Sequence, residues 1–536
     1  MQSRFHWTDS LLRLTGSLAL LILLSVLGCD SREAAVSDQT PTSNNSNLSV
    51  NSDATQTGSN AIAAPDKNSV VRNPADVDTL VTPAAQPRSD DNPMNQDGPK
   101  VAPLPLPLQF QGPDAEAKQL KVDSERLMAN GIRTVTGRRL ILHTDLPLDD
   151  ELRNLPKVFE LATQQFCKYF QLEESRIGEW QVRACIIQDM KRFERSGLLP
   201  QVLPKFQHGY ALGDRVFLKE QPSEYYRRHL LIHEGTHSFM LRFFQGAGPP
   251  WYMEGMAELL ATHQWDGTNL TLRAFPVDKT DVPFWGRVKI IKDDVAANRG
   301  KMIEEVMQYG SNAHLNVEAY GWSWAAAKFL DQHPQFQETF RKQFNKAGDS
   351  SPQFSINLVE AYGNEWFKVR QQWQLFVMNM EYGYDITREA IDDVPRQQYS
   401  EIARDQTFQI QANRGWQSTG LAVAKGMKIQ VAGSGRFVIH QEQSGDDVMP
   451  TLWESEANGI SIRYHNGKPI GTLLVAIDNL NQTGLTGLVS SGAIGTGGEI
   501  EIPQDGVLYF RINDHPAELA ENSGELEVNL TLVDGD

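Results

Sequence analysis

Residues 224–263 constrain the fold more than any other part of the chain, because they are typical of two helices joined by a glycine- and proline-rich break. The first predicted helix contains His233-Glu234-Gly235-Thr236-His237. Residues four apart lie on one face of a helix, so both imidazoles can point at a single ion. Glu234 lies beside them, where its carboxylate can take a proton from a metal-bound water.

The segment after the break supplies a third candidate ligand. It contains Glu254-Gly255-Met256-Ala257-Glu258, and sixteen residues separate His237 from Glu254. That length allows the second helix to fold back antiparallel, which brings the Glu254 carboxylate to the two imidazoles. Two histidines and a glutamate with one open position are typical of catalytic zinc. Glu258, one turn further on the same face, can accept a hydrogen bond from the second nitrogen of a ligand histidine.

The histidine pair followed by W-x-x-E-G-x-A-E resembles the gluzincin metallopeptidases of the peptidase-MA type. The resemblance implies that His233, His237 and Glu254 bind Zn²⁺ and that Glu234 is the general base. No G-x-M-E-N segment precedes the histidine pair, which departs from the aminopeptidase branch and favours an endopeptidase. Two other interpretations stay open: a helical hairpin with solvated charges, and a metal-binding relative without activity.

Gluzincins often carry a tyrosine or histidine, well downstream of the third ligand, that stabilises the oxyanion. Tyr320 follows Glu254 by 66 residues at the start of a predicted helix and resembles that tyrosine. The alternative is a tyrosine that only packs near Trp322 and Trp324, and His314 is the second choice of donor. His229, one turn before His233, is expected to pack beside the site rather than to bind the ion.

Residues 1–28 are predicted to be a signal peptide. Two arginines precede an apolar run that is too short to cross a bilayer comfortably. Val26-Leu27-Gly28-Cys29 resembles a lipobox, which implies an exported protein anchored by a lipid on Cys29 to the cell envelope membrane, on its periplasmic or outer face. The alternative is an ordinary signal peptide with an incidental cysteine.

Residues 29–114 are predicted to be a disordered tether, because 30–109 contain no aromatic residue and are dominated by small and polar side chains. Residues 115–395 are predicted to fold as α+β, with a small mixed sheet followed by a mostly helical domain. Strands are expected at 138–144 and 181–187, one or two more at 209–218, and a helix at 149–170. In gluzincins an edge strand holds an extended peptide, and 209–218 is the candidate for that edge.

Residues 396–536 are predicted to form an all-β sandwich, since short alternating runs are separated by glycine-rich turns. The stretch 512–528 resembles the calcium-binding end of galactose-binding bacterial lectins of the LecA type. The resemblance implies bound carbohydrate and Ca²⁺ ligands in the tail, namely Asp514, Glu518, Glu521 and Asn522. Glu521 stands where that family has an asparagine, and the alternative is a sandwich whose Asn-Ser-Gly makes a tight turn.

The charge balance argues against one class of partner. The chain has 50 basic and 67 acidic residues and no basic stripe, so nucleic acid is not an expected partner. Beyond Cys29 the cysteines are Cys167 and Cys185, and a disulfide and two buried free thiols are both open.

The sequence thus predicts a membrane-tethered, exported zinc metallopeptidase that hydrolyses peptide or protein substrates. The alternative is a non-catalytic, carbohydrate-binding envelope lipoprotein whose metal site is structural or vestigial.

Overall fold

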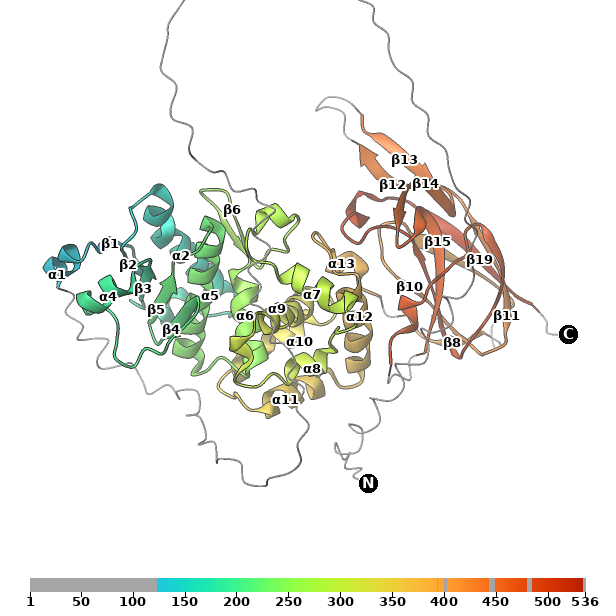
Figure 1. Cartoon of the computed structure of the whole chain (residues 1–536). Coiled ribbons are helices and arrows are strands. Elements are labelled where there is room, and N and C mark those ends of the chain that lie inside the picture. The colour runs from blue at the N-terminus through green and yellow to red at the C-terminus, as the bar shows by residue number, and fades with distance from the viewer. Residues whose placement is uncertain (1–122, 393, 400–402, 443–448, 480–483, 534–536) are drawn as a thin grey trace, which may run out of the picture. The chain divides into compact units, whose positions relative to one another are not determined.

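The computed structural model describes residues 123–392, 394–399, 403–442, 449–479 and 484–533, all within one compact unit, Lys100–Asp536 (Figure 1). The predicted signal peptide, Cys29, the tether and residues 115–122 lie outside the described residues. In the described ranges, no helix combines the length and the apolar character needed to cross a membrane. The predicted α+β class is confirmed: a small sheet is followed by a helical region and then by C-terminal sheets.

The N-terminal sheet has five strands in the order β1-β2-β3-β5-β4. They are β1 (Arg133–Thr136), β2 (Leu140–Thr144), β3 (Val182–Ile187), β4 (Gly209–Leu212) and β5 (Arg215–Lys219). The three central strands are parallel, and β1 and β4 pair antiparallel at the two edges. The sheet is therefore mixed, as predicted. Residues 209–218, predicted as one or two strands, form a hairpin of two, of which β4 alone lies at the edge.

Four helices accompany this sheet: α1 (Ser124–Ala129), α2 (Asp150–Tyr169), α3 (Glu174–Ile177) and α4 (Met190–Ser196). The long helix α2 begins where the Asp149 carboxylate accepts a hydrogen bond from the Leu152 amide at 2.8 Å. Cys167 on α2 and Cys185 on β3 are buried in two different apolar clusters and both are free thiols. The structure therefore agrees with two buried free thiols and not with a disulfide between Cys167 and Cys185.

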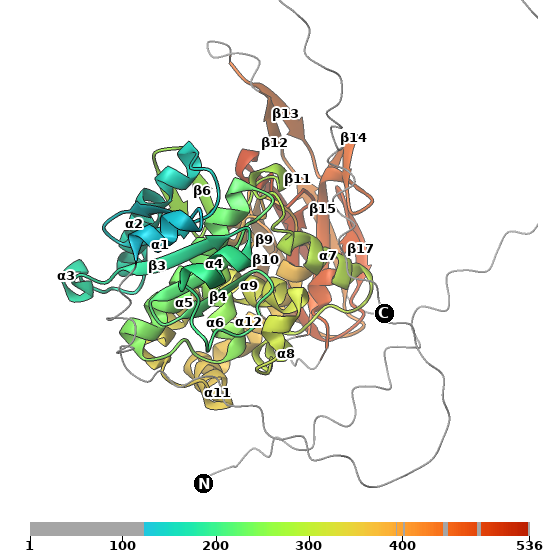
Figure 2. The same cartoon turned by 60° about the vertical axis from the view of Figure 1, so that its left-hand side comes forward.

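The helical region opens with α5 (Glu224–Phe244) and α6 (Pro250–Ala261), and Figures 1 and 2 place α5 beside β4 and β5. A short hairpin of β6 (His263–Trp265) and β7 (Leu270–Leu272) follows. The later helices are α7 (Arg287–Ala296), α8 (Ile303–Met307), α9 (Val317–Gln332), α10 (Gln337–Arg341), α11 (Pro352–Tyr362), α12 (Trp366–Met378) and α13 (Ile386–Glu389).

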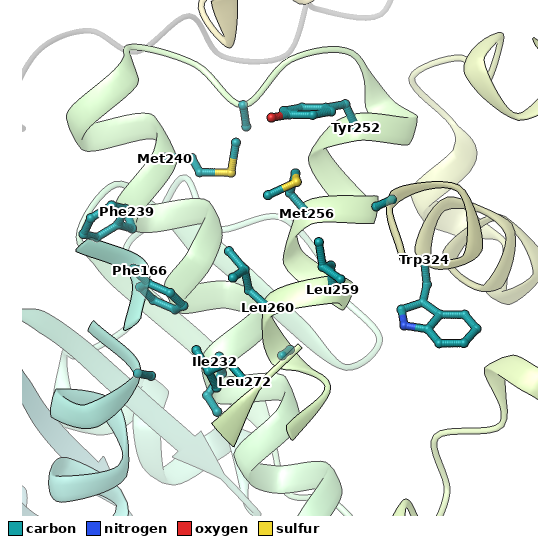
Figure 3. Packing of buried hydrophobic residues seen from close by; sticks show 14 of the residues in the cluster. Phe166, Ile232, Phe239, Met240, Tyr252, Met256, Leu259, Leu260, Leu272 and Trp324 are labelled. Atoms are coloured by element: carbon teal, nitrogen blue, oxygen red, sulfur yellow. The ribbon is translucent and has the colours of Figure 1, made fainter. Parts of the chain in front are cut away.

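The main core lies where α2, α5, α6 and α9 meet. Figure 3 shows Met240 of α5 pointing toward Met256 of α6, with Phe239 of α5 next to Phe166 of α2 and Trp324 of α9 on the other side of α6. All of these side chains are buried. Because burying each such side chain contributes about 1.5–3 kcal/mol, this packing holds α5 and α6 in a fixed relation.

The C-terminal part is all-β. A six-stranded sheet contains β14-β15-β18-β10-β8, with β16 paired to β15, and a four-stranded sheet has the order β17-β11-β19-β9. One apolar cluster joins the two sheets, with Leu473 and Phe510 from the first and Val431 and Val528 from the second. The sheets therefore pack face to face, as a sandwich does.

The strands of this part are as follows: β8 (Gln397–Gln398), β9 (Asp405–Gln411), β10 (Gln417–Val423), β11 (Lys428–Ser434), β12 (Phe437–Glu442), β13 (Thr451–Ser455), β14 (Asn458–His465), β15 (Lys468–Asp478), β16 (Gly492–Ala493), β17 (Gly497–Glu501), β18 (Gly506–Ile512) and β19 (Glu525–Val533). Strands β12 and β13 form a separate two-stranded ribbon.

Candidate metal centre

Local sequence sets the corner between α5 and α6. The Ser223 hydroxyl accepts a hydrogen bond from the Tyr226 amide at 3.1 Å and caps α5, which ends where Gln245 turns left-handed with φ at 60°. Pro250 then begins α6, because its fixed φ suits the first position of a helix. The Gly248 amide donates to the Ala347 carbonyl at 2.8 Å, and a Cβ on Gly246 would collide with that same carbonyl oxygen. The Ala347 carbonyl therefore fixes the turn between α5 and α6, and we call this contact the clamp.

The glycines inside the two motifs allow close helix packing. A Cβ on Gly235 would overlap the Phe159 ring of α2, and a Cβ on Gly255 would lie 2.7 Å from the Ser323 carbonyl oxygen of α9. Atoms at that distance repel strongly, so only glycine lets α5 approach α2 and α6 approach α9 this closely. The metal motif alone does not reveal this role, although glycines in a helix interior, which cost about 1 kcal/mol each, are a signal for it.

Three predicted ligands converge on one point. His233 Nε2 lies 3.2 Å from His237 Nε2 and 3.2 Å from Glu254 Oε2, and His237 Nε2 lies 3.5 Å from Glu254 Oε2. All three residues are buried, and Glu254 Oε2 has the two imidazoles as its neighbours, whereas His237 Nδ1 has no hydrogen-bond partner among the described residues. Burial opposes ionisation of Glu254, but the neighbouring His237 and His233 imidazoles lower its pKa to about 2. This buried group could hold a metal ion.

A second group shares His233 with the first. In it His229 Nε2 lies 3.3 Å from Glu258 Oε2, and His233 Nδ1 lies 3.3 Å from Glu258 Oε1. Arg287 already donates to both oxygens of Glu258, at 2.9 and 3.0 Å. Burial opposes ionisation, yet this guanidinium holds the pKa of Glu258 well below its usual range. A second cation would meet the charge of Arg287, so the group with Glu254 is the better candidate.

Glu258 thus lies where the sequence placed it, against the second nitrogen of His233, and His229 packs beside the site. The sequence analysis did not find Arg287, which occupies the first turn of α7. A positive charge is disfavoured at a helix N-terminus, so an arginine at this position indicates that a specific acidic side chain binds it.

Glu234 lies between α5 and the edge strand β4. It is 6% exposed, and burial raises the pKa of its carboxyl while the charges of His233 and His237 oppose the rise. The main chain at Ala211 hydrogen-bonds to this carboxylate. Burial, together with the Glu234 charge, also raises the pKa of Tyr210 on the same strand. Glu234 is therefore held next to the ligand group, outside the triangle of ligand atoms.

Tyr320 lies in the first turn of α9 beside the ligand group. Its ring centre is 5.8 Å from that of His233, and the Arg287 guanidinium carbon lies 5.6 Å from the same tyrosine ring. Burial, with the charges of Glu254 and Glu234, raises the pKa of Tyr320, so its hydroxyl stays protonated and can donate a hydrogen bond. The side chain of His314, the second choice, lies outside the described residues.

The four calcium candidates do not converge in the same way. Asp514 is fully buried and accepts a hydrogen bond from Asn522 Nδ2 at 2.8 Å, whereas Glu518 pairs with Arg463 and Glu521 pairs with His440. Among the described residues, no group of converging histidine, cysteine and carboxylate ligands includes them. The Arg463 guanidinium also lies 3.8 Å from Asp514 Oδ1, so a protein cation already partners two of the four. Calcium binding here stays a prediction.

Comparison with known proteins adds little to this geometry. No protein-family model matches the chain, and no curated protein is similar to it at a significant level. Among solved structures, one described as "EclA N-terminal domain; PllA-like lectin" is 17% identical, covers 24% of this chain and 95% of its own, and has a TM-score of 0.17. A TM-score this low does not establish a common fold.

Proposed function

We propose that this protein is a zinc-dependent metallopeptidase that cleaves within peptide chains. The observation that carries the proposal is the triangle of His233 Nε2, His237 Nε2 and Glu254 Oε2, with sides of 3.2, 3.2 and 3.5 Å. Tetrahedral zinc with ligand bonds of about 2.0–2.2 Å separates its ligand atoms by about 3.4 Å. Two nitrogens and one carboxylate oxygen leave one position open, which favours a catalytic over a structural site.

The burial of Glu254 also supports the fit, because a buried carboxylate is costly unless a cation satisfies its charge. Zinc bound by these three residues would supply a Lewis acid that polarises a carbonyl and lowers the pKa of a water. Glu258, itself fixed by Arg287, would orient the His233 ring through its Nδ1 atom.

The remaining residues have roles in proton transfer and charge stabilisation. Glu234 would take the proton of the attacking water and return it to the leaving amine, and its raised pKa suits both steps. The Tyr320 hydroxyl would donate a hydrogen bond to the oxygen on which negative charge develops. The edge strand β4 runs beside Glu234 and would align an extended peptide by adding a strand to the sheet.

The proposal also includes the cellular location of the protein and ligand binding by its C-terminal sandwich, and both of these depend on the sequence alone. Export and lipid anchoring depend on residues 1–28 and on Cys29. Carbohydrate and Ca²⁺ binding by the sandwich depend on the resemblance of 512–528 to lectins. The zinc site and the tail can be tested independently because they share no residue.

Metal content and peptide hydrolysis of the full-length, detergent-solubilised protein test the proposal. We expect one zinc per chain by mass spectrometry, and loss of that zinc in His237→Ala. Glu234→Gln should keep the metal and lose hydrolysis of a fluorogenic peptide library by at least ~100-fold. Glu224→Gln, in the exposed first turn of the same helix, is the matched control and should change neither quantity.

Two results would contradict the proposal. Parental activity in Glu234→Gln would exclude Glu234 as the general base. Bound zinc without hydrolysis of any peptide would favour the non-catalytic binding protein instead.

A further inference from the structure

We propose that Gly209 is a positioning residue, whose missing side chain creates the seat in which the Glu234 carboxylate rests. This inference builds on the proposed function, since the seat matters for catalysis only if Glu234 is the general base. The seat itself is a structural feature of β4 and α5, and it can be tested without any assay of hydrolysis.

The geometry at Gly209 leaves no room for a side chain. A Cβ atom there would lie 2.5 Å from Glu234 Oε1, 3.0 Å from Glu234 Cγ and 3.1 Å from Glu234 Cδ. These three nearest atoms all belong to one residue. Gly209 does not have a positive φ, so the backbone conformation itself is open to other amino acids. Close approach to Glu234 is therefore the reason for glycine at this position.

The strand register explains why β4 presents polar groups to this carboxylate. The His208 carbonyl accepts a hydrogen bond from the Lys219 amide at 2.8 Å, and β4 pairs antiparallel with β5. Backbone groups alternate between the two sides of a strand, so Gly209 and Ala211 direct theirs away from β5. The hydrogen bond between the Ala211 main chain and Glu234 agrees with this alternation. The Glu234 side chain thus lies against Gly209 and Ala211 of β4.

A side chain at position 209 would displace the movable end of Glu234 rather than the helix that carries it. Folding would therefore change little, whereas the carboxylate would leave the place from which it reaches the substrate water. Misplacing a catalytic group by 1 Å can cost up to about 100-fold in rate. The seat predicts a substitution that is mild for stability and severe for turnover.

The experiment compares Gly209→Ala with Gly310→Ala in the full-length protein. Gly310 is exposed, lacks a positive φ and has no atom within 4 Å of an added Cβ, so it is a matched control. We expect kcat of Gly209→Ala to fall at least ~10-fold, with KM within about twofold and zinc content unchanged. A crystal structure of that variant should show the Glu234 carboxylate displaced from the Ala211 main chain. Gly310→Ala should match the parent in every measurement.

A double-mutant cycle supplies a readout that needs no activity. Gly209→Ala should lower the melting temperature of the metal-free parent slightly and leave that of a Glu234→Ala background unchanged, because the atoms in conflict are then gone. Equal melting shifts in both backgrounds, or parental kcat with an unmoved carboxylate, would overturn the inference. A parent that hydrolyses no peptide would refute the proposed function alone, since the crystal structure and the cycle still test the seat.

Discussion

Replacement of Arg287 by methionine should destabilise this protein severely. Methionine keeps much of the length of the side chain but leaves the Glu258 carboxylate, which is 1% exposed, without its cationic partner. Arg287 donates two charge-assisted hydrogen bonds to that carboxylate, at 2.9 and 3.0 Å. Bonds of this kind contribute about 1.5–3 kcal/mol each, and breaking a buried ion pair from one side costs about 3–5 kcal/mol. The two ranges overlap, so we expect the free energy of unfolding to fall by about 4 kcal/mol.

That loss is measurable as a melting shift. For a domain of this size, 1 kcal/mol shifts the melting temperature by about 2–4 °C, so Arg287→Met should melt about 8–16 °C below the parent. Thermal unfolding followed by tryptophan fluorescence, on metal-free protein at pH 7, keeps metal binding out of the comparison. The control is Lys289→Met on the same helix, because Lys289 pairs with Asp293 at the surface, where such a pair contributes within about 1 kcal/mol. If both variants melt at the same temperature, the buried ion pair does not stabilise the fold as argued.

Three further substitutions test other parts of the structure. Burial lowers the pKa of His333 to about 4, so between pH 6.5 and 4 the unfolded chain binds a proton that the folded chain does not. The free energy of unfolding should therefore fall by about 3 kcal/mol as the pH drops from 6.5 to 4. In His333→Gln the free energy of unfolding should depend less on pH in this range, as measured by denaturant unfolding at each pH. Gly235→Ala should cost about 1–3 kcal/mol in urea unfolding because its methyl group overlaps Phe159, and the added substitution Phe159→Leu should recover part of the loss. Glu258→Gln should weaken zinc affinity by about 10–100-fold in a chelator competition while His233, His237 and Glu254 remain, and unchanged affinity would argue against its role in orienting His233.

The ligand group was predictable because its parts are local in sequence. The spacing of His233 and His237 on one helix, and the proline that starts the next, follow from periodicity and turn chemistry. The identity of the edge strand was only partly predictable. Residues 209–218 were predicted as one or two strands. Gly213 and Asp214 form the turn between two, and which of the two lies at the edge depends on where β3 lies. Strand order is a tertiary property that no local pattern contains.

Partners distant in sequence could not be predicted. Arg287 reaches Glu258 from a separate helix, and Arg463 on β14 reaches the acidic loop that resembles a calcium site. Strand β15 gives no alternating pattern in the sequence, because most of its residues are buried on both faces. Long-range ionic pairs and doubly buried strands are set by packing, so they become visible only in three dimensions.

The clamp of Ala347 on the corner between α5 and α6 has a consequence for how the chain folds as it is made. The three candidate ligand residues come from neighbouring helices, so they can meet as soon as residues 224–261 are available. Tyr320 and Ala347 are synthesised only after roughly 60 to 90 more residues, and contacts between residues so far apart form slowly. During synthesis the ligand hairpin therefore precedes the parts that fix its geometry, and a chain interrupted before Ala347 would hold the ligands on a corner that is still free to open.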